Sequence, residues 1–285
     1  MNEFVLITDS ACDIQPELLR SWDVQTLNLA FAFENQKTDE NMDLKEFYDR
    51  MRAGQVARTS AVNPGDFERL FRTVLAEGKD ILYLAFSSGL STTCNSANIA
   101  ADDLAAEFPD RKIIIVDSLC ASAGQGLFVY LVAEKKKEVG DIDQLAAYAE
   151  SLKLKICHWF TVDDLVYLKR GGRVSPTVAF VGGILGIKPV LHVDNDGHLI
   201  NISKVRGRKS AIRALARKYD ELAAHPDEGP VFISHGDCIE DAHTLAGILK
   251  ENHNIDVQVT ANIGPVIGAH SGPGTLALFF VGRER

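Results

Sequence analysis

The sequence has few cysteines and no disulfide pattern, which excludes two classes of protein. Among its 285 residues there are five cysteines, an odd number, and none are spaced Cys-x-x-Cys. Such scattered cysteines indicate a reducing compartment and argue against a disulfide framework or a zinc site. We therefore expect no metal. The five are Cys12, Cys94, Cys120, Cys157 and Cys238.

Long apolar runs and excess positive charge are also missing. No run approaches the length of a membrane-spanning helix, and the N-terminus lacks the basic region and apolar core of a signal peptide. The net charge is −9, whereas nucleic-acid binding needs a basic surface. We expect a cytoplasmic protein with no transmembrane segment and no nucleic-acid partner.

Several catalytic motifs are absent as well. The chain has no Gly-x-x-x-x-Gly-Lys-Ser/Thr, so it is not expected to bind ATP by itself. The order Ser-Ser-Gly-Leu-Ser at 87–91 is not the Gly-x-Ser-x-Gly elbow of a hydrolase. The glycines at 124–126 and 182–186 do not form a dinucleotide fingerprint and indicate close helix packing instead. No complete catalytic set emerges from these patterns, and no cofactor is expected.

What the sequence does contain is a strand that ends in a hydroxyl-rich turn. Residues 81–86 are apolar, 87–93 hold Ser, Thr and Gly, and 95–106 read as a helix. A helix N-terminus with added hydroxyl donors suits a small anion. Since the stretch lacks Lys and Arg, neutral donors would hold a carboxylate or a single phosphate. The alternative, that these hydroxyls only cap the helix, stays open.

The first half of the chain repeats this pattern of strand, polar end and helix. Strands are predicted near 4–7, 24–33, 81–86 and 113–116, which favours a parallel sheet flanked by helices. The polar groups at 8–10, 87–93 and 117–118 would then meet at one sheet edge as a shared pocket floor. Asp13 is a candidate cap for the helix that follows it.

The second half changes character after about residue 155. A strand is predicted at 158–162, a hairpin at 189–200 with its turn at Asp196-Gly197, and helices at 209–224 and 240–251. The last segment, from 257, reads as strands and turns. We predict two α/β domains, at 1–154 and 155–285, packed tightly and open to some exchange of elements.

Two further patterns could carry chemistry. His270 lies in Gly-Ala-His-Ser-Gly-Pro-Gly and could reach a cleft, although a core role is the usual one for a lone histidine. His235 is a weaker candidate. Basic clusters at 169–173 and 204–209 could form a solvated face or a docking patch for an acidic or phosphate-bearing partner.

An ordered series of motifs runs from about residue 4 to 281. It comprises Thr-Asp-Ser-x-x-Asp, Thr59-Ser60, Ser-Ser-Gly-Leu-Ser-x-Thr, Val-Asp-Ser, Leu-Lys-Arg-Gly-Gly-Arg-Val-Ser, Gly-Ile-Lys-Pro-Val and Gly-x-His-x-Gly-Pro-Gly. Taken in this order, the motifs resemble the DegV family of bacterial fatty-acid-binding proteins, which includes the acyl-carrier subunit of fatty acid kinase. The sequence departs from the family pattern at 61–63 and 92–94.

The resemblance implies two α/β domains, the second with a mixed sheet, and a long-chain fatty acid buried in a cavity between and within them. It implies that hydroxyls and a histidine hold the carboxylate, and that a separate ATP-binding kinase subunit phosphorylates it to an acyl phosphate. The matching head-group residues are Thr59, Ser60, Ser88, Ser91 and His270. Those matching the kinase-facing surface are Arg170, Arg173 and Arg206.

Three hypotheses therefore remain: a lipid carrier without its own active site, a self-sufficient Ser/His hydrolase or small-molecule transferase using Ser91 and His270, and a binding module for a short anion. In the first, the apolar segment 178–187 would form a tunnel wall, with ordinary core as its alternative. A transient membrane contact also stays open for a lipid carrier.

Overall fold

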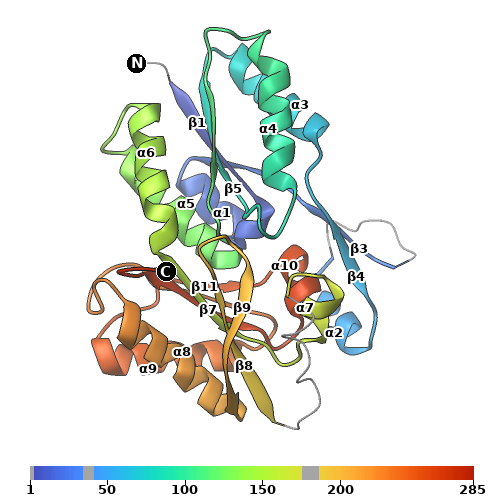
Figure 1. Ribbon diagram of the computed structural model, residues 1–285, viewed down its shortest axis with the longest axis vertical. Coiled ribbons are helices and arrows are strands. Elements are labelled where there is room, and N and C mark those ends of the chain that lie inside the picture. Colours follow the sequence, from blue (N-terminus) through green and yellow to red (C-terminus); the bar gives the residue numbers. More distant parts are fainter. Residues whose placement is uncertain (1–2, 35–41, 175–185) are drawn as a thin grey trace.

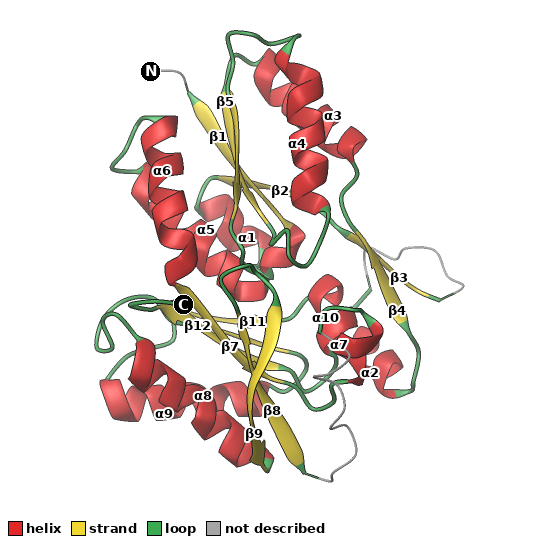
Figure 2. Cartoon of the chain, viewed as in Figure 1, coloured by secondary structure: helices red, strands yellow, loops and turns green. Residues whose placement is uncertain are grey.

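The computed structural model describes residues 3–34, 42–174 and 186–285, and its strands form three sheets (Figures 1 and 2). Sheet A has four parallel strands in the order β2-β1-β5-β6. Sheet C has six strands in the order β11-β10-β12-β7-β8-β9, with β10 and β11 parallel and the other pairs antiparallel. Strands β3 and β4 form a small antiparallel sheet of their own. The predicted α/β class, with one parallel and one mixed sheet, is confirmed.

The strands are β1 Phe4–Asp9, β2 Val24–Leu27, β3 Ala30–Phe33, β4 Ala57–Ser60, β5 Asp80–Ala85, β6 Ile113–Asp117, β7 Ile156–Thr161, β8 Ile187–Val193, β9 Leu199–Arg206, β10 Phe232–His235, β11 Val259–Asn262 and β12 Leu276–Val281. The α-helices are α1 Pro16–Ser21, α2 Leu44–Arg52, α3 Pro64–Ala76, α4 Thr93–Ala105, α5 Ser122–Lys136, α6 Ile142–Leu152, α7 Val166–Arg170, α8 Arg208–Leu222, α9 Ile239–His253 and α10 Pro265–Ser271. Two 3₁₀ turns, η1 Ser10–Cys12 and η2 Lys153–Lys155, complete the elements.

Helix α5 lies between the two large sheets, and its first half is covered on all sides. Every residue from 122 to 129 is buried, as expected for a helix that is apolar around its whole circumference. Gly124 and Gly126 allow this close packing, because a Cβ there would collide with His158 and Ile14, respectively. Helices α3 and α4 cover the other face of sheet A, and α8 and α9 cover the other face of sheet C. The core is thus layered, with α5 shared by both halves.

The two large sheets come from separate parts of the chain, since sheet A ends at Asp117 and sheet C begins at Ile156. The predicted division into domains at 154/155 falls in this interval and stays a prediction. The segment β3–α2–β4 leaves its own half and packs against α7 and α10 (Figure 1).

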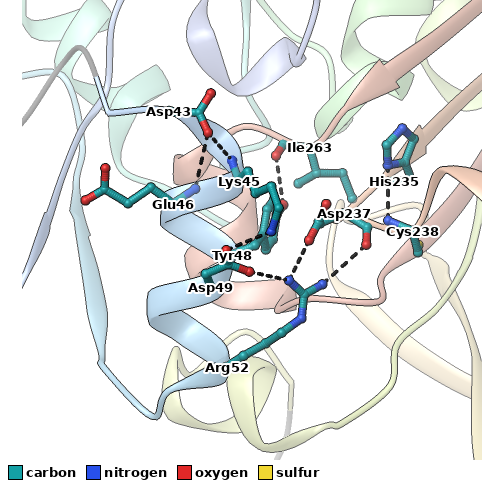
Figure 3. Close-up of polar contacts among 10 residues, drawn as sticks. All are labelled: Asp43, Lys45, Glu46, Tyr48, Asp49, Arg52, His235, Asp237, Cys238 and Ile263. Carbon is teal, nitrogen blue, oxygen red and sulfur yellow. Dashed lines mark hydrogen bonds and ion pairs between the residues drawn. The ribbon is translucent and has the colours of Figure 1, made fainter.

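Polar contacts join α2 to the second half of the chain (Figure 3). The buried Tyr48 hydroxyl donates to the Ile263 carbonyl oxygen at 2.8 Å. Arg52 forms an ion pair with Asp237 at 2.5 Å, with 42% and 35% of the two side chains exposed. Because α10 begins just after Ile263, these contacts hold α2 and the adjoining strand β4 against α10.

For one segment the sequence predicted the wrong kind of secondary structure. The Gly-rich segment around His270 was expected to be strand and turn, but residues 265–271 form helix α10. Pro265 occupies the first helical position, and Gly272, with φ of +81°, ends the helix. The glycines inside the segment hid its helical period.

Asp13 does not cap the following helix α1, as was predicted, because Gln15 is the N-cap of α1 and the Asp13 carboxylate accepts hydrogen bonds from Ser122 Oγ and Gly264 N. No helix of the described segments is both long and apolar enough to cross a bilayer.

We predict that Tyr48→Phe lowers the free energy of unfolding by about 1–3 kcal/mol, because the buried Ile263 carbonyl loses its donor. Arg52→Ala should lower the free energy of unfolding by about 0–1 kcal/mol, because the ion pair of Arg52 with Asp237 is partly exposed. Urea unfolding measures both changes. A larger loss for Arg52→Ala than for Tyr48→Phe would contradict this ranking.

Candidate functional site

A cavity of about 490 Å³ lies between helix α10, one face of sheet C and the serine turn, which is the segment 86–92 that joins β5 to α4. Its lining is mostly apolar, and its polar side chains come from several separate elements. The lining residues are Leu29, Thr59, Ala61, Phe86, Ser88, Leu90, Ser91, Thr92, Ala121, Ser122, His158, Phe160, Leu168, Arg173, Val193, Leu199, Ile263, Val266, Ile267, His270, Ser271, Thr275, Ala277 and Phe279.

The strands of sheet C form the floor of this cavity. Ala277 and Phe279 alternate along β12, so their side chains point to the same face, and Thr275 lines the cavity just before the strand begins. Phe160 and His158 of β7 lie directly opposite Ala277 and Phe279 in the antiparallel register and extend that face. Helix α5 begins beside them at residue 122, so the cavity occupies the space that the helix leaves uncovered.

His270 and Thr59 form the polar pair at the head of the cavity. Thr59 Oγ1 and His270 Nε2 are 2.8 Å apart. Gly171 packs against the imidazole and has no room for a Cβ. Burial, and secondarily the positive charge of Arg173, lowers the pKa of His270 from 6.5 to about 4, so the imidazole is neutral at pH 7. Stability from this neutral form is present above pH 6.5 and is lost as the pH falls toward 4.

The serine turn between β5 and α4 is fixed by two aspartates from neighbouring strands. Asp9 Oδ2 accepts from Phe86 N at 2.9 Å and from the Tyr83 hydroxyl at 2.6 Å. Asp117 Oδ1 accepts from Ser88 N at 3.2 Å. Burial raises the pKa of Asp9 despite these bonds. The predicted polar edge of sheet A therefore exists, but its aspartates lie behind the turn and hold it, instead of lining the cavity.

The turn of the β8–β9 hairpin locks the serine turn from the other side. Ser87 Oγ donates to the Gly197 carbonyl oxygen at 2.9 Å in a buried bond. A Cβ at Gly89 would lie 2.7 Å from the Asp196 carbonyl oxygen, so only glycine fits there. Gly197 has a φ of +77°, as the predicted Asp-Gly turn requires.

The predicted head-group residues separate into two groups. Thr59, Ser88, Ser91 and His270 all line the cavity, with Ser88 exposed at its mouth. Ser91 Oγ lies 2.9 Å from Thr93 Oγ1 and accepts from Thr93 N, so it also helps to start α4. Ser60 is exposed and does not line the cavity, because neighbouring residues of a strand point to opposite faces.

The three predicted docking arginines also fall into two groups, two on the surface and one in the cavity lining. Arg170 and Arg206 are exposed. Arg173 is half-buried and lines the cavity, with Nε donating to the Leu90 carbonyl oxygen at 3.1 Å. It also donates to the Gly171 carbonyl oxygen, and burial lowers its pKa. The expectation that neutral donors alone would face the anion was therefore incomplete, because a guanidinium lies at the head of the cavity.

The remaining sequence predictions concern His235, the expected tunnel wall and the two departures from the family pattern. His235 lies in β10 outside the cavity lining, where its Nδ1 accepts from Cys238 N at 3.4 Å. Most of the expected tunnel wall, residues 178–185, lies outside the described residues. Both departures from the family pattern reach the cavity, through Ala61 and Thr92. The apolar floor was missed because it depends on pairing between strands far apart in the chain.

The sequence profile of the DegV family matches residues 3–283. The chain belongs to the DegV family. A DegV domain-containing protein from Clostridium perfringens is 43% identical over 289 residues, covering 100% of this chain and 99% of the relative. One from a Streptococcus pyogenes serotype M3 strain is 34% identical over 285 residues, covering 99% of both chains.

Solved DegV structures have the same fold. A DegV family protein from Thermus thermophilus, described as binding fatty acid, superposes with a TM-score of 0.84 at 29% identity and covers 98% of this chain and 99% of its own. A fatty-acid-binding DegV family protein from Streptococcus agalactiae superposes with a TM-score of 0.87 at 27% identity, covering 100% of both chains.

We predict that Arg173→Gln raises the pKa of His270 from about 4 toward 6.5, because it removes the positive charge that disfavours the imidazolium. NMR titration of the His270 ring measures the change. The matched control is Arg170→Gln, which removes an exposed charge from the same corner and should leave the titration unchanged. Equal shifts in both variants would contradict the assignment.

Proposed function

We propose that this chain binds a long-chain fatty acid in the cavity and presents its carboxylate to a separate ATP-dependent kinase subunit, which phosphorylates it to an acyl phosphate. The observation that carries the proposal is that one cavity combines an apolar floor with a polar head that contains Thr59, Ser91, Arg173 and His270. Fatty-acid binding by DegV relatives with the same fold supports it.

The cavity suits an acyl chain in size and chemistry. Its volume of about 490 Å³ falls within the roughly 300–1,000 Å³ typical of small-molecule pockets. Each methylene buried there contributes about 0.8 kcal/mol, so the tail supplies most of the affinity. A short anion would leave this apolar surface unused, which disfavours the short-anion module.

The head of the cavity can satisfy a carboxylate without neutralising it in a buried pair. The Ser91 hydroxyl can donate to a carboxylate oxygen. If the neutral imidazole of His270 donates from Nε2 to Thr59 Oγ1, the Thr59 hydroxyl is free to donate to the carboxylate as well, so His270 orients this donor. Arg173 adds positive charge at the edge, where it is only half-buried. The mouth is formed by the exposed residues Ser88 and Thr92, so the head group would lie within reach of a partner.

The geometry disfavours the hydrolase alternative. A serine nucleophile needs a base within hydrogen-bond reach. The hydrogen-bond partner of Ser91 Oγ is Thr93, and that of His270 Nε2 is Thr59. Within the described residues, no hydrogen bond joins Ser91 to His270. The chain would therefore supply the lipid, and its partner would supply ATP and the phosphoryl-transfer chemistry.

We predict that Thr59→Val weakens fatty-acid binding about fivefold, because it removes one hydrogen bond worth about 1 kcal/mol. Binding of the methyl ester should change less, because the ester lacks the charged carboxylate. Titration calorimetry with stearic acid and methyl stearate measures both. Ser60→Ala is the matched control and should leave both affinities unchanged. An equal loss of fatty-acid affinity in the two variants would show that Thr59 does not bind the head group.

We predict that Arg170→Ala retains fatty-acid binding but weakens phosphorylation of the bound acid by the kinase subunit. Arg170 is exposed on α7 and does not line the cavity, so its charge is available to a partner. Mass spectrometry of a denatured extract measures the bound lipid, and acyl phosphate formation measures the second step. Loss of bound lipid in this variant would count against the docking role.

A further inference from the structure

Ser271 is the one cavity-lining hydroxyl of the described chain that is buried without a hydrogen-bond partner. Only 4% of the residue is exposed. Its Oγ has no partner, although the residue lines a mostly apolar cavity. A buried hydroxyl without a partner destabilises a protein unless something in the site satisfies it.

The other buried hydroxyls of the lining are already satisfied. Ser122 Oγ donates to Asp13 Oδ2 at 2.6 Å and lies 2.9 Å from Ser234 Oγ. Thr275 Oγ1 donates to the carbonyl oxygens of Ser271 and Gly272 at 2.9 and 2.8 Å. Among the buried hydroxyls of the lining, Ser271 Oγ is therefore the one that a ligand could engage without breaking a bond in the protein.

The position of Ser271 decides which part of a lipid it could reach. It follows His270 at the end of α10, so it lies next to the head-group site. The bond from Thr275 fixes this end of the helix to the start of β12. Two residues further along β12, Ala277 lines the same face and adds little bulk to the floor. A substituent near the carboxyl end of an acyl chain would meet Ser271 before the chain enters the apolar part.

We propose that Ser271 forms a polar subsite that selects long-chain fatty acids carrying a hydroxyl group close to the carboxylate. A serine hydroxyl both donates and accepts, so it can pair with a lipid hydroxyl in either direction. An unsubstituted acid fits the same cavity but leaves Ser271 unsatisfied. The inference rests on the proposed fatty-acid binding and adds the class of acid that is preferred.

The test is a comparison of stearic acid with its 2-hydroxy, 3-hydroxy and 12-hydroxy derivatives by titration calorimetry. For each variant, the affinity for the hydroxy acid is divided by its affinity for stearic acid. We expect the 2- or 3-hydroxy acid to bind the natural protein about fivefold more tightly than stearic acid. The 12-hydroxy acid should bind more weakly than stearic acid, because its hydroxyl enters apolar surroundings.

Ser271→Ala and Ser271→Cys should both reduce the ratio to about one, the second with little change in side-chain volume. Ser203→Ala, at an exposed position on β9 outside the lining, should keep the ratio of the natural protein. A ratio of one or less for both proximal isomers in the natural protein would overturn the proposal, as would a preference that survives in both Ser271 variants. Failure of every acid, stearic included, would instead overturn the proposed function.

Thermal unfolding of the ligand-free protein gives a second readout. Ser271→Ala should leave the midpoint unchanged or raise it, because the lost hydroxyl had no partner. Ser122→Ala should lower the midpoint by at least about 2 °C, because Asp13 and Ser234 each lose a hydrogen-bond partner. A fall in the Ser271→Ala midpoint as large as that of Ser122→Ala would show that Ser271 is bonded within the protein, and would contradict the proposal.

Discussion

The whole arrangement depends on the burial of helix α5 between two sheets. Sheet A and sheet C pack on the same helix, so the two halves of the chain share one apolar layer. The helix begins at Ser122, while the face of sheet C continues past it through Phe279, Ala277 and Thr275. The cavity lies on this uncovered part of the sheet, so it follows from where the helix starts.

The polar head of the cavity is assembled from four separate parts of the chain. The serine turn comes from sheet A, Thr59 from the small β3–β4 sheet, His270 from α10, and Arg173 from the corner after α7. Each part is held by contacts outside the cavity, such as the Asp9 bonds to the serine turn and the Tyr48 bond beside α10. This support leaves the side chains at the head available for a ligand.

Where structure is encoded locally, the sequence predicted it well. The strand, turn and helix from residue 80 to 105 could be predicted because an apolar run, turn residues and a helical pattern follow one another directly. The β8–β9 hairpin followed from Asp196-Gly197 in the same way. Helix α10 could not be predicted, because its glycine content and short length resemble a turn.

The site was harder to predict because it depends on contacts between distant segments. Thr59 and Ser60 have similar side chains, and only the register of β4 decides which one faces the cavity. Arg170 and Arg173 belong to one basic cluster, yet the turn after α7 directs only Arg173 inward, to the Leu90 carbonyl. The motif series itself pointed to the DegV family, which the match over residues 3–283 confirms.

The most direct test is a crystal structure of this chain with stearic acid bound. We predict the carboxylate within hydrogen-bond distance of Thr59 and His270, with the hydrocarbon tail along Phe160, Ala277 and Phe279. A tail on the protein surface, or a carboxylate at the His158 end of the cavity, would contradict this prediction.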